Sequence, residues 1–91
     1  MKWQCMFCDA VVEGSSDSET RARGIGHLLR QHYPELEDRF VREYVGDCGT
    51  RDCSHHFEPA GAGEDHPGFT CPHCGEDQSE WYAGMVVADT L

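Results

Sequence analysis

Paired cysteines constrain the fold of this chain more than any other feature. The chain has 91 residues and six cysteines, which fall into three close pairs at positions 5 and 8, 48 and 53, and 71 and 74. A chain of this length can fold alone, but half of it buries too little apolar surface to fold without a covalent or metal staple. The cysteine pairs, together with six histidines, are therefore the candidate staples.

The N-terminal segment indicates whether the paired cysteines form disulfides or bind metal. The segment MKWQCMFCDA has neither the apolar run nor the small-residue cleavage site of a secretory signal. No segment reaches the length of a transmembrane helix. We therefore expect a cytoplasmic protein without membrane contact, in which reduced, paired cysteines bind metal rather than each other.

The charge balance is strongly acidic. There are 17 acidic residues against six arginines and a single lysine, Lys2, and the acids are spread along the whole chain. An ordinary acidic protein is one interpretation, but the near absence of lysine favours adaptation to a high-salt cytoplasm. The composition lacks the basic footprint that is typical of nucleic-acid-binding proteins.

The N-terminal third carries four metal-ligating residues in the order Cys-x2-Cys, His-x4-His. They are Cys5, Cys8, His27 and His32. Thiolate and imidazole donors in this number suit tetrahedral zinc. Residues 3–12 predict two short strands around the Cys-x2-Cys turn.

A helix is predicted to bring the two histidines over this turn. Ser16 and Glu19 have the spacing of a capping box at its start. Pro34 ends it near His32, because the residue before a proline disfavours helical geometry. A second helix is predicted from about Pro34 to Val45, with Gly46 as its stop.

Residues 3–34 resemble the two-Cys, two-His zinc finger family, in which a strand hairpin packs on a helix. The resemblance implies one zinc ion and a small core of Phe7 with Leu28 or Leu29. The linker between the cysteines and the histidines has 18 residues, whereas the usual finger has about twelve. The insertion falls in the polar segment EGSSDS, where a loop can absorb it.

The same resemblance bears on DNA recognition. Its base-reading positions would fall near Thr20, Ala22, Arg23 and Gly26, and among these Arg23 alone can read guanine through two hydrogen bonds. One finger covers only about 3 bp, so we do not expect sequence-specific DNA binding through it alone. Arg21, Arg23 and Arg30 nevertheless remain the candidate contacts to nucleic acid.

The C-terminal half contains a second set of cysteines: Cys48, Cys53, Cys71 and Cys74. Cys71-Pro-His-Cys74 also matches a redox motif of thioredoxin-like proteins, but that chemistry requires a helix N-terminus in a βαβ unit. Only 17 residues follow the motif, and residues 81–87, WYAGMVV, predict a strand. We therefore favour metal binding.

The segment Cys-Pro-x-Cys-Gly resembles the knuckle of zinc ribbons and rubredoxins. The resemblance implies a four-thiolate site, which zinc suits best and which would also hold a single iron ion. Because Cys48 and Cys53 are separated by four residues instead of two, His56 is an alternative ligand in place of Cys48.

Together these patterns predict a small, metal-stabilised α+β protein with two zinc ions. The predicted parts are a ββα zinc finger at 1–34, a connecting amphipathic helix at 35–46 and a zinc-ribbon-like β module at 47–91. The acidic composition, the scarcity of lysine and the TCPHCG knuckle resemble the small zinc finger proteins of haloarchaea and their viruses. That resemblance implies a regulatory or interaction module.

Three functions compete at this stage. The first is a protein-binding module anchored by exposed aromatic residues: Trp3, Tyr33, Trp81 and Tyr82. The second is nucleic-acid binding through the arginines of the finger helix, and the third is electron transfer through iron at the four-cysteine site. Catalysis is not expected, because both sets already supply four ligands and leave no open coordination position. The oligomeric state is left open.

Overall fold

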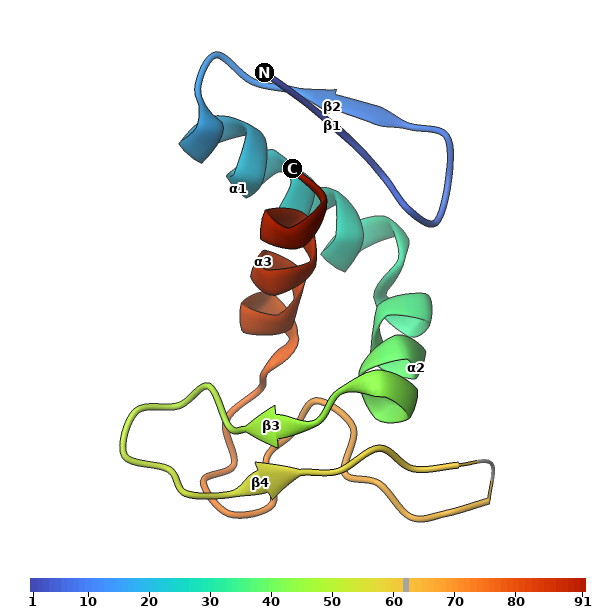
Figure 1. The fold of residues 1–91 in the computed structure, drawn as a ribbon, viewed down its shortest axis with the longest axis vertical. Coiled ribbons are helices and arrows are strands. Elements are labelled where there is room, and N and C mark those ends of the chain that lie inside the picture. The colour runs from blue at the N-terminus through green and yellow to red at the C-terminus, as the bar shows by residue number, and fades with distance from the viewer. Residues whose placement is uncertain (62) are drawn as a thin grey trace.

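The computed structural model describes residues 1–61 and 63–91, which form three helices and two antiparallel two-stranded sheets. In chain order the elements are β1 (Lys2–Gln4), β2 (Val11–Glu13), α1 (Asp17–Gln31), α2 (Tyr33–Glu43), β3 (Gly46–Asp47), β4 (His56–Phe57) and α3 (Ser79–Thr90). The β1–β2 hairpin lies at one end of the molecule and the β3–β4 ribbon at the other, with the helices between them (Figure 1). None of the helices in the described residues is long and apolar enough to cross a bilayer.

Local sequence signals set the boundaries of the first two helices. The Ser16 hydroxyl accepts a hydrogen bond from the Glu19 amide at 3.1 Å, as the capping spacing predicts. Helix α1 ends at Gln31, and His32 caps it with φ −133° and ψ 29°, outside helical geometry. Pro34 then stands in the first turn of α2, which ends at Glu43, two residues before the predicted end.

The predicted strand at residues 81–87 is wrong, because this segment belongs to helix α3. Its buried residues are Tyr82, Ala83, Val86 and Val87, which share one helical face. That face packs against α1, where a Cβ added to Gly24 would lie 3.2 Å from a Val87 methyl group. Aromatic and β-branched residues favour strands locally, but burial against a neighbouring element can override this preference.

This correction changes the character of the C-terminal part. Among the described residues after 45, the β-structure consists of the two-residue strands β3 and β4 and an isolated bridge between Thr70 and Asp77. The predicted zinc-ribbon-like β module is therefore a short ribbon with irregular loops followed by a helix. Its helix contacts α1, so the predicted N-terminal and C-terminal parts share packing.

An aromatic cluster forms the centre of the core. The ring of Phe40 lies 5.1 Å from that of Phe57, 4.9 Å from that of Phe69 and 5.0 Å from that of Tyr82. These rings come from α2, β4, the loop before the Cys71 knuckle and α3. The cluster therefore joins β4 and the loop before the Cys71 knuckle to helices α2 and α3.

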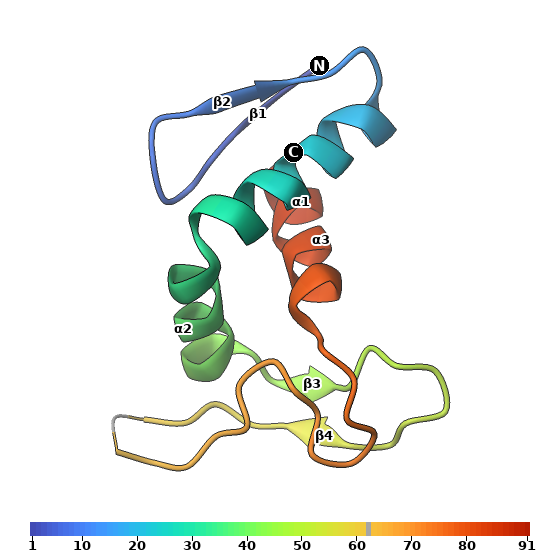
Figure 2. The ribbon, with the colours of Figure 1, turned by 180° about the vertical axis from the view of Figure 1, so that it is seen from behind.

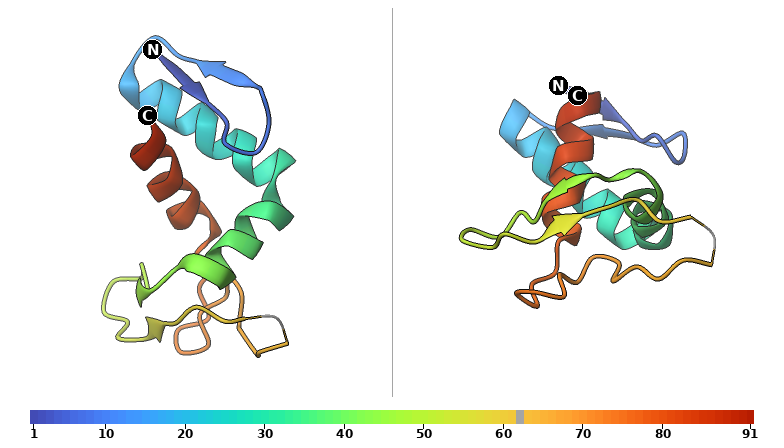
Figure 3. Two further views of the ribbon diagram at one scale, coloured as in Figure 1. Left: turned by 45° about the vertical axis from the view of Figure 1, so that its right-hand side comes forward. Right: turned by 60° about the horizontal axis from the view of Figure 1, so that its bottom comes forward.

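Trp3 and Tyr82 were predicted to be exposed anchors. This is wrong, because they are core residues that are 1% and 5% exposed. The indole nitrogen of Trp3 donates a hydrogen bond to the Thr90 hydroxyl at 2.6 Å. This contact ties the N-terminal hairpin to the last turn of α3, and the two termini lie close together (Figure 3). Tyr33 and Trp81 remain exposed, at 36% and 38%.

Candidate metal centres

The first cluster of ligand atoms forms where the β1–β2 turn meets the end of α1 (Figure 2). Its members are Cys5, Cys8, His27 and His32, whose ligand atoms all lie within 4.8 Å of one another. The turn supplies both thiols, α1 supplies the first imidazole, and its C-cap supplies the second. The sequence-predicted residues are thus brought together in one place.

The separations of these atoms match a tetrahedral ion. Sγ of Cys8 lies 3.5 Å from Nε2 of His27 and 3.3 Å from Nε2 of His32. Zinc bonds of about 2.3 Å to sulfur and about 2.0 Å to nitrogen, at tetrahedral angles, place the two donors about 3.5 Å apart. The site therefore has donor types that suit zinc, and the two separations from Cys8 fit a tetrahedral zinc ion.

The backbone explains how a His-x4-His spacing reaches one ion. Five residues overshoot a single helical turn, so two histidines on a continuous helix would diverge. Because the chain leaves helical geometry at His32, its ring can turn back toward the thiols. The end of the helix before Pro34 therefore allows both histidines to face the same pair of thiols.

The surroundings favour the metal-binding protonation state at Cys8 and His27 but not at the other two ligands, since burial raises the pKa of the Cys5 thiol and the hydrogen bond to Cys8 raises the pKa of His32. The Ala10 backbone amide and the His32 ring lower the pKa of the Cys8 thiol, which promotes the thiolate. Burial lowers the pKa of His27, which keeps this imidazole neutral. A thiolate and a neutral imidazole are the forms that coordinate metal.

One residue of this site escaped the sequence analysis. Oε2 of Glu35 lies 2.8 Å from Nδ1 of His32, on the ring nitrogen opposite the one that faces Cys8. Carboxylates in this position orient metal-binding histidines and hold their tautomer. The signal was present in the sequence, since Glu35 follows His32 by three residues and a residue at that spacing in the first turn of a helix can reach back to the N-cap.

The second cluster contains the four C-terminal cysteines: Cys48, Cys53, Cys71 and Cys74. Their sulfur atoms lie within 4.8 Å of one another. Cys48 and Cys74 are 3.8 Å apart, and Cys53 and Cys71 are 3.7 Å apart. Tetrahedral Zn–S bonds separate two sulfurs by about 3.8 Å, so this set also fits a four-coordinate ion.

Backbone amides and a buried glutamine shape this second site. The Thr50 amide donates to Sγ of Cys48 at 3.4 Å. Gly75, at φ 76°, allows the turn after Cys74 in a region that favours glycine. The Gln78 side chain, 2% exposed, accepts a hydrogen bond from the Gly49 amide at 3.0 Å and so joins the two cysteine turns. Gln78 was not predicted as a supporting residue.

The thiols of this cluster cannot all ionise by themselves. Hydrogen bonds from Thr50 and from the Glu76 amide lower the pKa of Cys74 to about 6. The His55 amide acts in the same direction on Cys53, but burial and the neighbouring cysteines raise the pKa of that thiol to about 12. A bound cation removes this conflict, because it stabilises every thiolate at once.

The alternative ligand His56 lies outside this group. Its Nδ1 is 3.2 Å from the Asp47 carboxylate, and its Nε2 is 3.1 Å from the Glu58 carboxylate. Both ring nitrogens are therefore occupied by carboxylates. The arrangement of the described residues favours the four-cysteine set over the set with His56.

The redox interpretation of Cys71-Pro-His-Cys74 finds no support in this geometry. All six cysteines of the chain lie in the described residues and none forms a disulfide. Helix α3 begins at Ser79, so Cys71 does not stand at a helix N-terminus, where a lowered thiol pKa would arise from the helix dipole.

No family model, curated protein sequence or solved structure matches this chain. The resemblances to two-Cys, two-His fingers and to haloarchaeal zinc proteins therefore rest on the motifs alone. The structure adds to them two clusters of cysteine and histidine ligand atoms that could each hold a metal ion.

Proposed function

We propose that this protein is a small zinc-binding interaction module with a regulatory role, in which two structural zinc ions hold a surface for a protein partner. The observation that carries the proposal is the pair of four-donor clusters, in each of which the ligand atoms lie within 4.8 Å of one another. Four protein ligands complete the coordination of zinc and leave no position for a reactive water. The proposal therefore assigns the metals to folding and makes the protein a non-enzyme.

The energetic argument supports structural metals. A structural zinc site in a small domain contributes apparent binding free energy of about 10–16 kcal/mol, which is released as folding free energy. The clusters lie at the β1–β2 turn and beside the β3–β4 ribbon, where the described chain has only strands of two or three residues and irregular loops. Zinc at both places would hold segments that regular secondary structure does not hold.

The charge distribution favours a protein partner over nucleic acid. Arg21 and Arg23 form ion pairs with Asp17 and Glu19, at 3.3 Å and 3.0 Å. At about 100° per residue, Arg21 and Arg30 lie on opposite sides of α1. Because these arginines are paired with acidic residues or lie on opposite sides of the helix, they do not form a continuous basic surface for a phosphate backbone.

The acidic composition and the single lysine support a high-salt cytoplasmic setting of the archaeal type. Iron remains the alternative metal for the four-thiolate site, because rubredoxin-type sites use the same ligands. An iron–thiolate protein would be red, whereas the zinc protein would be colourless, so the two are separated by absorbance.

Metal analysis of the purified chain tests this proposal. Native mass spectrometry should find two zinc ions per chain, one ion in Cys8→Ser and one in Cys74→Ser. His73→Asn, a matched change in the same knuckle as Cys74, should keep both. Removal of zinc with a chelator should abolish the cooperative unfolding transition followed by circular dichroism. A chain that folds cooperatively without metal would overturn the proposal.

A further inference from the structure

A groove lined by both apolar and charged side chains lies between the first metal turn, the end of α2 and the exposed side of α3. Its volume is about 350 Å³. Its apolar wall, which we call the methionine groove, consists of Met6, Tyr44, Val45, Tyr82, Met85 and Val86. A volume of this size accommodates a few apolar side chains of a partner.

The groove collects exposed apolar side chains that the fold does not bury. Met6 is 39% exposed, Val45 58% and Met85 37%. Methionine side chains are flexible and polarisable, and they recur on surfaces that bind apolar segments of other proteins. Apolar side chains gathered in one groove indicate a binding surface more strongly than the same residues scattered singly.

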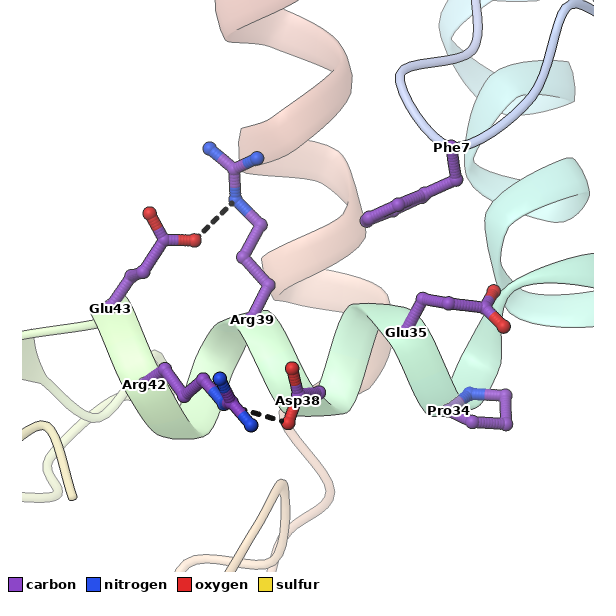
Figure 4. Close-up of a pocket in the computed structure, with 7 residues that line it drawn as sticks. All are labelled: Phe7, Pro34, Glu35, Asp38, Arg39, Arg42 and Glu43. Carbon is purple, nitrogen blue, oxygen red and sulfur yellow. Dashed lines mark hydrogen bonds and ion pairs between the residues drawn. The ribbon is translucent and has the colours of Figure 1, made fainter. Parts of the chain in front are cut away.

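The charges at the edge of the groove indicate what kind of segment it accepts. Nε of Arg39 lies 3.5 Å from Oε2 of Glu43, and its Nη1 lies 3.3 Å from the sulfur of Met6. Arg39 rises from α2 beside Glu43, on the side of the helix that Phe7 overhangs (Figure 4). The cation at the edge is thus already paired.

The remaining edge charge is the carboxylate of Asp89, which has no ion pair among the described residues. The whole chain carries a formal net charge of −10. The unpaired carboxylate favours a basic segment in direct contact with it, whereas a second copy of the chain would bring an equal negative charge.

The walls of the groove connect it to both metal centres. Met6 stands between the ligands Cys5 and Cys8, and Val45 precedes Cys48 by three residues. The third wall, α3, is packed against α1. Loss of either ion would release one wall, so the shape of the groove depends on metal loading.

We infer that the methionine groove is the docking site of the module and that it binds an amphipathic segment of a partner protein, with apolar side chains flanked by lysine or arginine. This inference rests on the proposed function and names its partner class. The apolar side chains of the segment would contact Met6, Val45 and Met85. Its basic residues would face the carboxylate of Asp89.

Methionine methyl signals offer a direct test, because the chain contains only Met1, Met6 and Met85. The zinc-loaded protein is labelled with ¹³C at the methionine methyl groups. It is titrated with a synthetic amphipathic peptide of leucine and lysine, and separately with a peptide in which glutamate replaces lysine. We expect the lysine peptide to shift Met6 and Met85 in a saturable way while Met1 stays unchanged. The glutamate peptide should shift none of the three.

Two exposed valines provide matched variants. Val45 in the groove is 58% exposed, and Val11 on β2 is 53% exposed and lies outside the groove. Val45→Ser should weaken binding of the lysine peptide about tenfold, as expected for loss of a buried valine contact. Val11→Ser should bind as the unchanged chain does.

The outcomes separate this inference from the proposed function. Equal shifts of all three methionines, or equal weakening by both valine variants, would overturn the docking site. If the Met6 and Met85 signals shift with protein concentration in the absence of peptide, the occupant of the groove is a second copy of the chain and not a partner protein. If the chain holds two zinc ions and the lysine peptide shifts none of its methyl signals, the docking inference alone is overturned. A purified chain that contains no zinc would overturn the proposed function.

Discussion

The carboxylate of Glu35 lies 2.8 Å from Nδ1 of His32, while the other nitrogen of that ring lies 3.3 Å from the sulfur of Cys8. The imidazole is therefore held from both sides. A carboxylate that accepts from Nδ1–H leaves the lone pair of Nε2 free for a metal and makes this nitrogen a stronger donor.

Glu35→Ala should lower the zinc affinity of the N-terminal site by about 10- to 100-fold, the usual effect of losing such a partner. A chelator competition checks this, followed through the Phe7 amide, which donates to the sulfur of Cys5. Asp38→Ala, on the next turn of α2, is the control, since Asp38 pairs with Arg42 rather than with a ligand. Equal affinity in both variants would contradict the role of Glu35.

The choice between Cys48 and His56 as ligand is tested by two substitutions. Sγ of Cys48 lies 3.8 Å from Sγ of Cys74, whereas both nitrogens of His56 face carboxylates. His56→Asn should keep two zinc ions per chain, and Cys48→Ser should keep one, as counted by native mass spectrometry. The reverse result would assign the site to the histidine.

The glycines of α1 should respond differently to alanine. A Cβ at Gly24 would lie 3.2 Å from both the Trp3 ring and a Val87 methyl group, while at Gly26 the nearest atom is the mobile Arg30 guanidinium at 2.9 Å. Gly26→Ala should raise the free energy of unfolding by up to about 1 kcal/mol, because alanine favours the helix.

Gly24→Ala gains the same helix preference but crowds the packing between α1, α3 and the hairpin. Overpacking of this kind costs about 1–3 kcal/mol. We therefore expect Gly24→Ala to be the less stable of the two variants in chemical denaturation of the zinc-loaded chain. If Gly24→Ala were as stable as Gly26→Ala, the contact between the helices would be looser than the structure shows.

The half-buried imidazole of His66 should make the loop before the Cys71 knuckle sensitive to acid. Its Nδ1 accepts a hydrogen bond from the Gly68 amide at 2.8 Å, and its Nε2 is buried without a partner among the described residues. Burial lowers the pKa of His66, although the Glu37 carboxylate opposes this and His55 adds to it.

Because folding favours the neutral ring, the unfolded chain takes up the proton first as the pH falls below about 6.5. The contribution of His66 to stability is therefore complete above that pH and is lost below it. The Gly68 amide signal should titrate with a midpoint below about 6.5. The free energy of unfolding of His66→Gln should fall less steeply in acid than that of the unchanged chain. A Gly68 signal that is insensitive to pH down to the release of zinc would contradict this prediction.

Features that depend on neighbouring residues could be read from the sequence. The cap at Ser16, the helix end before Pro34 and the close spacing of the cysteine pairs are all local, since each involves groups a few residues apart. Their energies do not depend on distant contacts. The two candidate ligand sets could be predicted for the same reason, because each is built from short motifs on predictable turns and helix ends.

Tertiary packing decided that residues 81–87 form a helix. Their aromatic and β-branched side chains suit a strand, but as a helix Tyr82 and Val86 face the core together, and Val87 meets Gly24 of α1. The same holds for the burial of Trp3 against Thr90 and for the methionine groove, which joins residues 6, 45 and 85. The sequence by itself determined helices α1 and α2 and the two candidate ligand sets. The core and the methionine groove arose only when segments distant in the chain were packed together, because burial energy depends on the partner surface and not on the segment alone.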